Sequence, residues 1–478
     1  MAWATTSCTW CGCSPTDFKR IPPLKTIAQI AAELQGYDPQ ALSAADVNQF
    51  LDRLVEPVTA TEVLPLFSAL GRVLAQDVIS PVSVPPHDNS AMDGYAFAGA
   101  QLVAGQPLTL CVVGTALAGK AWAGTVAAGE CVKIMTGAIM PAGLDTVVPQ
   151  EFTTTTADGH VTIAADVLRA GDNRRFKGED IMEGRVALAR GELLTPAALG
   201  LVASLGLPTV TVYRRLRVAY FSTGDEILSL GEAPREGAVY DSNRYTVFGL
   251  LTRMGVEVID LGVVRDEPAL LEAAFRQAAQ QADAIITSGG VSVGEADHTR
   301  TMMKKLGDVA FWRIAMRPGR PMAVGRIGNA ENQAVSASSA SASSADSYQN
   351  DINTDINTAP GGAVLFGLPG NPVAVMVTFL AFVRPALLRM MGSTRAAPPL
   401  LRAISTEPMR KKPGRTEYQR GLVTTAADGT LQVRTTGNQG SGVLSSMVQA
   451  NGLIVLHHGQ GNVAVGDAVD VMVFEGVI

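Results

Sequence analysis

A short stretch in the second half of the chain combines features of a phosphate-binding loop with acidic side chains. In TSGGVSVGEADH (residues 287–298), three glycines are followed by Glu295 and Asp297. Glycines let backbone N–H groups approach an anion closely, because no Cβ atom intervenes. The lysine that completes a P-loop is absent from this stretch. The stretch therefore indicates a loop whose anionic ligand arrives with a divalent cation.

Two neighbouring loops also carry pairs of acids. Asp225 and Glu226 lie in STGDE, and Asp266 and Glu267 lie in VVRDEP. Any one pair is explained by N-capping of the helix that follows it. Six acids converging on one crevice would repel one another unless a cation lay among them. Mg²⁺ takes oxygen ligands and bridges carboxylates to phosphates, so we favour a Mg²⁺ site over simple capping.

Basic side chains are concentrated in two other segments. Arg313, Arg317 and Arg320 lie within WRIAMRPGRP, and a second segment holds five more: Arg410, Lys411, Lys412, Arg415 and Arg420. Either segment is also explained as ordinary solvated surface. Arginine, however, presents a planar fork of donors that suits oxyanions. Together with the acidic loops, these segments favour an anionic ligand bridged by a metal.

The elements that position these loops alternate between strands and helices from Arg217 to Gly392. The apolar runs RVAYFSTG, VEVIDLGVV, DAIITSGG and VLFGLPG each precede a helical stretch. This alternation predicts a doubly wound, mostly parallel α/β domain. Ligands bind such sheets at the C-terminal ends of the strands. That rule selects the loops at 222–226, 263–268, 288–297 and 368–372.

The remaining chain predicts flanking domains of other kinds. Helical spacing from Leu42 to Val78, with Ser43 as N-cap, and a helix beginning at Thr195–Pro196 predict a helical domain. Short apolar runs with Gly and Pro between them predict β-rich domains before and after the α/β domain. The predicted division is a disordered extension at 1–26, a helical and linker domain at 27–82 and 181–214, a β-rich module at 83–180, the α/β domain at 215–395 with a flexible insertion at 329–361, and a C-terminal β-barrel-like domain at 396–478.

Composition limits the classes of function. The chain has 478 residues, 47% of them hydrophobic and 17% charged, with a net charge of −6. This is typical of a globular protein and disfavours nucleic-acid or membrane-surface binding. The apolar run from Pro372 to Val383 predicts a buried helix. Three of the five cysteines lie near the N-terminus, where a disordered tail is favoured over a metal site, and we expect a cytoplasmic protein.

The motifs of the chain, taken in order, resemble those of one enzyme family. DNSAMDGYA, IMTGA, FSTGDE, YDSNR, SGGVSVGEAD, RPGRP, LPGNP and YQRG occur in sequence between residues 40 and 478. This set is similar to the MoeA-type molybdopterin molybdenumtransferases, a family that includes the E domain of gephyrin. The resemblance implies insertion of molybdate into adenylylated molybdopterin, with Mg²⁺-dependent release of AMP. It also implies a homodimer in which the β module of one subunit completes the cleft of the other.

The resemblance further implies roles for individual residues. The positions that match functional acids and their partners are Asp93, Thr136, Glu226, Asp266 and Asp297, of which Glu226, Asp266 and Asp297 are the expected metal ligands. The positions that match ligand-contacting residues are Asp241, Ser242, Asn243, Ser288, Gly289, Gly290, Gly294, Pro369, Gly370, Asn371 and Pro372. The positions that match a molybdate-binding cluster are Arg317, Arg320, Arg420 and Ser441. Read without the resemblance, the loops around Asp93 and Thr136 are ordinary polar turns.

Two alternative functions remain open at this point. One is the molybdopterin adenylyltransferase that acts in the preceding step and has a related α/β domain, although the three additional domains argue against it. The other is a scaffold that binds the cofactor or its partners. The acids in three of the four sheet loops argue against a purely non-catalytic role of this kind. Partner proteins expected from the resemblance are that adenylyltransferase and proteins of molybdoenzyme maturation; no nucleic acid and no membrane are expected.

Overall fold

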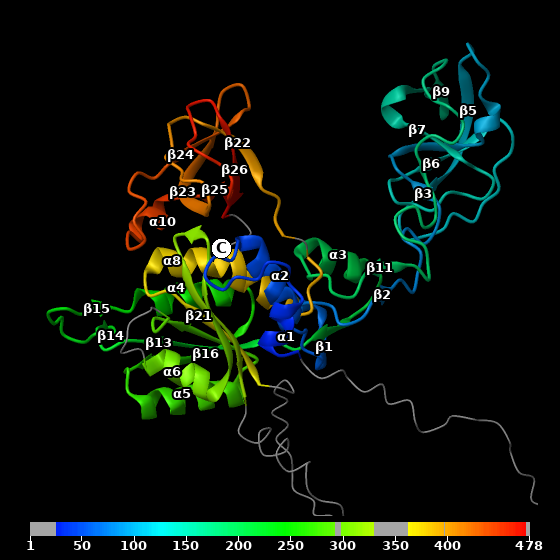
Figure 1. The fold of residues 1–478 in the computed structure, drawn as a ribbon. Helices are drawn as coiled ribbons and strands as arrows, with labels where there is room; N and C mark the ends of the chain where they lie inside the picture. The colour runs from blue at the N-terminus through cyan, green and yellow to red at the C-terminus, as the bar shows by residue number, and fades with distance from the viewer. Residues whose placement is uncertain (1–24, 292–297, 329–361, 396, 475–478) are drawn as a thin grey trace, which may run out of the picture.

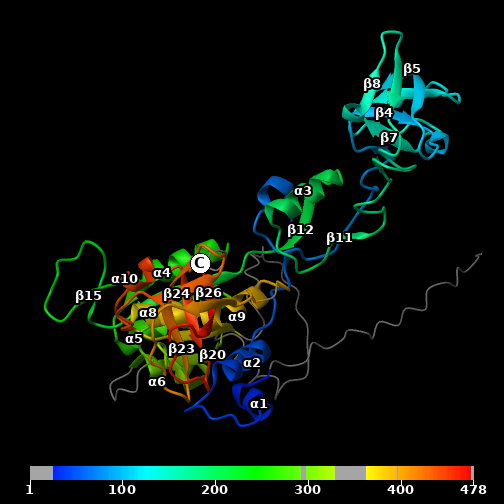
Figure 2. The same ribbon diagram turned by 90° about the horizontal axis from the view of Figure 1, so that it is seen from above.

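The chain forms several domains in an elongated arrangement, with a β-rich module held apart from the rest (Figure 1). The computed structural model describes residues 25–291, 298–328, 362–395 and 397–474. The predicted disordered extension and the predicted insertion therefore lie almost entirely outside the described residues. Viewed from above, a slender linker joins the β module to the body formed by the α/β and C-terminal domains (Figure 2).

A six-stranded mixed sheet is the centre of the α/β domain. Its four neighbouring parallel strands are followed by two antiparallel strands at one edge. In spatial order the strands are β16 (Glu257–Val264), β13 (Arg217–Thr223), β17 (Ala284–Ser288), β21 (Ala363–Leu368), β20 (Pro321–Ile327) and β18 (Gly307–Arg313). The predicted mostly parallel sheet is confirmed.

Helices cover both faces of this sheet, as a doubly wound fold requires. Alternate residues of β13 show the two faces: Val218 and Tyr220 belong to one buried cluster, and Ala219 and Phe221 belong to another. The first face packs against α4 (Ser242–Arg253) and α8 (Pro372–Thr378), and the second against α5 (Pro268–Gln281) and α6 (His298–Leu306). The apolar strand runs are explained by this burial on both sides.

One long apolar helix, Pro372–Met390, is part of the core. It continues from α8 through a π-helical turn (Phe379–Val383) into α9 (Arg384–Met390). Its length and hydropathy would suit a membrane span, but 83% of its apolar stretch is buried inside the protein. The predicted buried helix is thus confirmed, and it extends past Arg384 to Met390.

Two N-terminal helices, α1 (Ile27–Ala32) and α2 (Ala44–Leu54), pack against the α/β domain. Their buried side chains belong to the same cluster as β13 and α8. Ser43 caps α2 in a capping box with Asp46, as predicted. The helical prediction beyond Leu54 is wrong, because that segment forms β1 (Thr61–Pro65), a 3₁₀ turn (Leu66–Ser68) and β2 (Val78–Ile79). Two prolines and a run of β-branched residues disfavour a helix there.

A linker of two small sheets and one helix leads to the β module. β1 pairs with β12 (Thr209–Tyr213), β2 pairs with β11 (Val186–Leu188), and α3 (Pro196–Ser204) begins at the Thr195 cap as predicted. The module contains a six-stranded sheet in the order β7 (Thr146–Pro149), β4 (Gly94–Phe97), β6 (Glu130–Ile134), β5 (Leu108–Ala116), β9 (His160–Ile163) and β8 (Thr153–Thr155). It also has the pair β3 (Asn89–Ser90) and β10 (Arg174–Arg175), and 3₁₀ turns at Gly99–Gln101 and Gln150–Phe152.

The C-terminal domain is a closed five-stranded barrel. Strand β23 pairs with both β24 and β25, which closes the ring. Its strands are β23 (Thr416–Thr425), β24 (Leu431–Thr435), β22 (Leu401–Ser405), β26 (Ala468–Val473) and β25 (Gly452–Leu456), with helix α10 (Ser445–Gln449) and the added strand β19 (Met316–Arg317). Since β19 belongs to the α/β domain in sequence, it ties the barrel to that domain.

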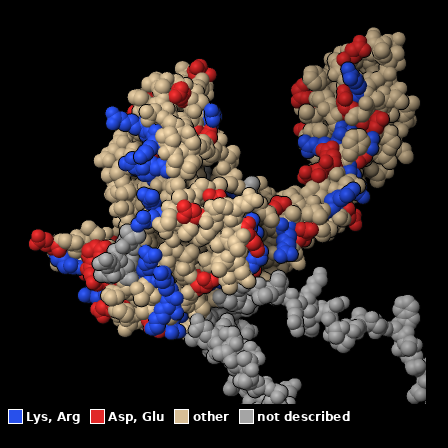
Figure 3. All heavy atoms as spheres, viewed as in Figure 1, with Lys and Arg blue, Asp and Glu red and all other residues tan. Residues whose placement is uncertain are grey.

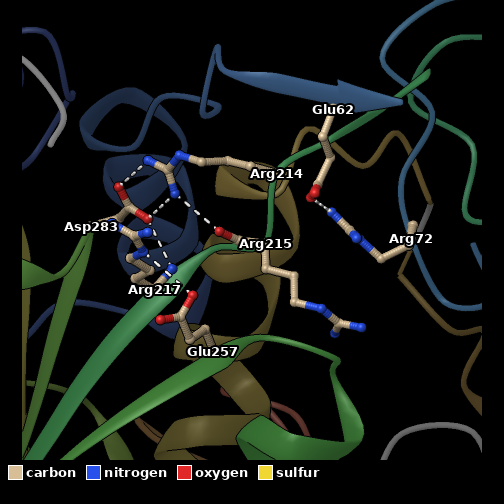
Figure 4. Close-up of polar contacts among 7 residues, drawn as sticks. All are labelled: Glu62, Arg72, Arg214, Arg215, Arg217, Glu257 and Asp283. Carbon is tan, nitrogen blue, oxygen red and sulfur yellow. Dashed lines mark hydrogen bonds and ion pairs between the residues drawn. The ribbon is translucent and has the colours of Figure 1, made fainter. Parts of the chain in front are cut away.

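An ion pair holds the junction between the linker and the α/β domain (Figure 4). Arg214, between β12 and β13, donates two hydrogen bonds of 2.8 and 2.7 Å to the carboxylate of Asp283. The Asp283 side chain is only 2% exposed and also accepts from the backbone N–H of Arg217 at 2.9 Å. Arg72 reinforces the junction by donating to the Tyr213 carbonyl and pairing with Glu62. These contacts hold the segment between β12 and β13 in place, where the linker meets the sheet of the α/β domain.

Replacing Arg214 by Ala is expected to lower the free energy of unfolding by about 3 kcal/mol, because a buried carboxylate would lose its charged partner. Urea denaturation measures this change. The matched control is Arg217→Ala, which removes a long, exposed contact of 3.4 Å with Glu257 and should cost less than about 0.5 kcal/mol. Equal effects of the two substitutions would contradict a structural role for the Arg214–Asp283 pair.

Candidate active site

A cavity of about 760 Å³ opens at the C-terminal ends of the parallel strands. Its walls come from the loops that follow β13, β16, β17 and β21, which are the four loops selected by the sheet rule. The described lining residues are Thr223, Gly224, Glu226, Ile227, Val239, Tyr240, Asp241, Ser242, Asn243, Asp266, Ser288, Gly289, Gly290, Val291, Thr299, Pro321, Pro369, Gly370, Asn371, Pro372 and Gly442. Most of the predicted ligand-contacting residues are therefore brought together.

Three carboxylate residues line this cavity: Glu226 and Asp266, in the loops after two adjacent strands, and Asp241, at the start of α4. Asp266 accepts a hydrogen bond of 3.2 Å from the hydroxyl of Thr299, which orients the carboxylate. The neighbouring Asp225 accepts instead from the backbone N–H of Asp266 at 3.2 Å. Asp225 is thus used to shape the loop, and Glu226 and Asp266 remain the acids of these two loops that line the cavity.

Glu226 and Asp266 suit a magnesium ion better than a metal held wholly by protein. Within the described residues, no group of three or more His, Cys, Asp or Glu side chains is placed to hold a metal. Mg²⁺ is commonly bound by one or two carboxylates together with substrate phosphates. The two acids fit that arrangement. The third predicted ligand, Asp297, lies outside the described residues, as do Glu295 and Gly294.

The two adjacent glycines after β17 are required by packing. Gly289 and Gly290 have φ angles of +91° and +62°. A Cβ atom on Gly289 would lie 2.5 Å from the Thr223 carbonyl oxygen, and one on Gly290 would lie 2.5 Å from the Thr299 Cβ atom. The loop can therefore lie close against β13 and α6 only when both positions lack a side chain.

A buried group of hydroxyls lies at the ends of β13 and β17, next to these glycines. The Tyr220 phenol lies 2.7 Å from the Ser288 hydroxyl and 2.9 Å from that of Ser222. Burial raises the pKa of the Tyr220 phenol, so it stays protonated. Ser288 lines the cavity as predicted, while its hydroxyl is already held by Tyr220.

The first turn of α4 forms another wall of the cavity. Asp241 is the N-cap, and its Oδ1 atom accepts from the backbone N–H of Arg244 at 3.1 Å. Two residues later, Asn243 donates from Nδ2 to the Gly370 carbonyl at 2.7 Å. This bond ties α4 to the LPGNP loop, in which Pro372 is the first residue of α8.

Known family models match nearly the whole described chain. They are the MoeA N-terminal region (domain I and II) at residues 42–206, the probable molybdopterin binding domain at 219–389, and the MoeA C-terminal region (domain IV) at 402–474. A molybdopterin molybdenumtransferase of Haemophilus influenzae is 40% identical over 432 residues, covering 90% of this chain and 98% of that protein. The chain belongs to the MoeA family.

Other MoeA proteins agree with this assignment. A molybdopterin molybdenumtransferase of a Nostoc species is 33% identical over 87% of this chain and 88% of its own length. A solved structure of a molybdopterin biosynthesis moeA protein from Pyrococcus horikoshii aligns with a TM-score of 0.70 at 24% identity, covering 91% of this chain and 100% of that one. This structural likeness shows that the fold is shared.

The arginines expected to bind molybdate lie beside the cavity and do not line it. Arg420 is 1% exposed and donates to the Ser446 hydroxyl at 2.9 Å and the Gly440 carbonyl at 2.9 Å. Burial, and then the charge of Arg317, lower the pKa of Arg420 to about 10. Arg317 and Arg320 are exposed, and further Lys and Arg side chains are visible on the C-terminal and α/β domains (Figure 3).

Ser441 belongs to a loop of the barrel that reaches the α/β domain. Its carbonyl accepts from the backbone N–H of Val373 at 3.1 Å, at the start of α8. The next residue, Gly442, lines the cavity, as does Pro321, which follows Arg320. Arg320 and Ser441, which belong to two separate segments of the predicted anion cluster, are therefore each next to a residue that lines the cavity.

Asp93 and Thr136 lie together in the β module, and this module stands apart from the α/β domain that holds the cavity (Figures 1 and 2). The backbone N–H and the hydroxyl of Thr136 donate to Asp93 Oδ1 at 2.7 and 2.8 Å. These hydrogen bonds, the backbone one first, lower the pKa of Asp93 and keep it ionised. The structure pairs these two residues and separates them from the other predicted site residues.

Sequence reasoning missed several cavity residues, notably Thr223, Tyr240 and Thr299. Thr223 and Tyr240 lie inside the FSTGDE and YDSNR motifs, where acidic and amide neighbours gave the stronger signal. Thr299 lies on α6, after the glycine-rich loop, and only its contact with Asp266 shows that it matters.

Proposed function

We propose that this MoeA-family protein takes adenylylated molybdopterin and molybdate, inserts molybdenum at the dithiolene of the pterin, and releases AMP. Relatives over nearly their full length are named molybdopterin molybdenumtransferase, and on this ground the protein is a transferase of molybdenum cofactor biosynthesis. The observation that carries the proposal is the convergence of Glu226 and Asp266 on one cavity with the glycine turn and the LPGNP loop. The adenylyltransferase alternative is disfavoured by the complete set of MoeA regions.

The acid pair is the proposed Mg²⁺ site. Glu226 and Asp266 would hold the ion, which when bound offsets the negative charge of the phosphates. The residues of the chain then act by positioning: Thr299 orients Asp266, and the turn at Gly289 and Gly290 lets the ligand approach the sheet. Cleavage of a phosphoanhydride depends mainly on such positioning and electrostatics.

The positively charged groups at the cavity rim are the proposed molybdate site. Arg317 and Arg320 are exposed beside Pro321, and they can meet an incoming oxyanion with their guanidinium forks. Arg420 is already bonded to protein groups, so its main effect is to hold the loop that contains Ser441 and Gly442. Its charge contributes to the positive field of the rim.

A homodimer is proposed to complete the cleft. Asp93 and Thr136 belong to the β module, which stands apart from the α/β domain (Figure 1), so we place them in the cavity of a second copy. Exposed apolar side chains such as Phe67, Tyr245 and Phe248 offer surface for this association. The enzyme that adenylylates molybdopterin would supply the substrate, and we expect both to work in the cytoplasm.

The purified protein, given adenylylated molybdopterin, Mg²⁺ and molybdate, is expected to release AMP only when molybdate is present. Chromatography measures AMP, and elemental analysis of the pterin product measures bound molybdenum. Release of AMP that does not depend on molybdate would contradict the proposal. Adenylylation of molybdopterin from ATP would favour the adenylyltransferase instead.

A further inference from the structure

Three hydroxyl groups meet at the ends of β13 and β17, beside the cavity. The Tyr220 phenol oxygen lies 2.7 Å from Ser288 Oγ and 2.9 Å from Ser222 Oγ, and the two serine oxygens are 3.2 Å apart. Ser222 and Ser288 are partners in the parallel register, and Tyr220 lies two residues before Ser222. The three side chains therefore share one face of the sheet. Ser288 lines the cavity, whereas Tyr220 and Ser222 do not.

This cluster has three hydrogens to distribute, one on each oxygen. The phenol keeps its hydrogen because burial raises the pKa of Tyr220. Hydroxyl oxygens in a good hydrogen bond are about 2.5–3.0 Å apart, so the phenol makes two such bonds and the contact between the serines is weak. Two bonds use two hydrogens. Within the described residues the three hydroxyls have no partners other than one another, so the third hydrogen is left over.

The direction of the two bonds decides which serine carries the third hydrogen. A phenol is more acidic than an aliphatic alcohol and is the better donor, and its shorter contact is the one with Ser288. If Tyr220 donates to Ser288 and accepts from Ser222, the remaining hydrogen is on Ser288, at the cavity wall. The opposite direction would leave it on Ser222, which is 2% exposed and does not line the cavity. An unpaired donor is costly there, so the first direction is favoured.

An oxyanion is the ligand group that suits this donor best. Hydrogen bonds to charged acceptors are stronger than those between neutral groups, and a chain of hydroxyls polarises its last donor. Ser288 comes directly before the turn at Gly289 and Gly290, and its strand lies beside β13, whose loop carries Glu226 of the proposed Mg²⁺ site. We propose that Tyr220 is a positioning residue that directs the Ser288 hydroxyl toward a phosphate oxygen of the nucleotide, an inference that rests on the proposed function.

The test compares AMP with adenosine, which lacks the phosphate. Calorimetry with the full chain and Mg²⁺ measures both affinities. Ser288→Ala is expected to weaken AMP binding about tenfold, because it removes a hydrogen bond to a charged group. Tyr220→Phe keeps the ring and removes only the hydroxyl, and should weaken AMP binding about fivefold while leaving adenosine binding unchanged. Because Tyr220 acts through Ser288, the double variant should bind AMP within about twofold of Ser288→Ala alone.

Tyr213→Phe is the matched control. It removes another buried phenol hydroxyl, which accepts from Arg190 Nε at 2.6 Å and lies outside the cavity lining, so AMP affinity should stay at the wild-type value. Equal losses in the two tyrosine variants, additive losses in the double variant, or a loss of adenosine affinity as large as that of AMP would overturn the inference.

Molybdate, titrated alone by the same method, distinguishes the other oxyanion of the proposed reaction. The wild-type protein and Tyr220→Phe should bind it equally. A loss confined to molybdate would overturn the assignment to phosphate, as would failure of the wild-type protein to bind AMP at millimolar concentration. A larger loss of AMP affinity in Ser222→Ala than in Ser288→Ala would place the free hydrogen on Ser222 and would also overturn the inference.

The two proposals fail in different ways. If AMP affinity depends on Tyr220 and Ser288 but AMP release does not depend on molybdate, the role of Tyr220 stands as a binding property and the proposed reaction is wrong. If molybdate-dependent turnover is present while both substitutions leave AMP affinity unchanged, the reaction stands and the role of Tyr220 is wrong.

Discussion

Replacing Asp266 by Asn is expected to lower molybdate-dependent AMP release by about a hundredfold or more. A group that stabilises developing charge in a preorganised site typically contributes a factor of this size. Asn can still accept the hydrogen bond from Thr299, so the loop should keep its shape. What is lost is the negative charge that, with Glu226, is proposed to hold Mg²⁺. The rate of AMP release at saturating substrate measures the effect.

Glu267→Gln is the matched control for this substitution. Glu267 is the neighbouring acid of the same loop, is exposed, and makes no side-chain capping hydrogen bond. It does not line the cavity. The control therefore removes the same charge nearby and should leave turnover within about twofold of the wild type. A Mg²⁺ titration adds a second measurement, since Asp266→Asn should need more Mg²⁺ for half-maximal rate. Equal losses in both variants would contradict the role of Asp266.

The α/β domain could be predicted because its strands are buried on both faces and are therefore apolar throughout. Tyr220 and Phe221 point to opposite cores, so no alternation appears in the sequence and the run reads as a parallel strand. The segment after Leu54 was mispredicted because Val55 and Val58 continue the helical spacing of Leu51 and Leu54. The strand that follows, β1, is formed by pairing with β12, which is about 150 residues away in sequence.

The location of the site followed from the sheet rule, but the role of each side chain did not. Asp225 and Glu226 are adjacent acids, and only the contact of Asp225 with the Asp266 N–H shows which of them faces the cavity. Ser288 was expected to contact the ligand, and the buried Tyr220 that holds its hydroxyl comes from another strand. The wall formed by α4 depends on the contacts of Asp241 with Arg244 and of Asn243 with Gly370. Such contacts between distant residues leave no pattern in one sequence.

Mixing two inactive variants is expected to restore activity if the cleft is shared between subunits. Asp93→Asn alters the β module but keeps an acceptor for the Thr136 turn, and Asp266→Asn alters the cavity. Each variant alone should be inactive. In a dimer with one subunit of each kind, one of the two clefts combines an intact cavity with an intact β module. Random pairing in a one-to-one mixture makes half of the dimers mixed, which predicts about a quarter of wild-type AMP release.

The control mixes Asp266→Asn with Glu226→Gln, because both substitutions alter the same cavity. Every cleft in that mixture carries one damaged cavity, whichever subunits pair, so no activity should return. Recovery in the first mixture without recovery in the second would place Asp93 of one copy at the cavity of another. If neither mixture recovers although size measurements show that the subunits exchange, the cleft is built from a single chain. Asp93 would then have to reach its own cavity by a movement of the linker through the junction at Arg214 and Asp283.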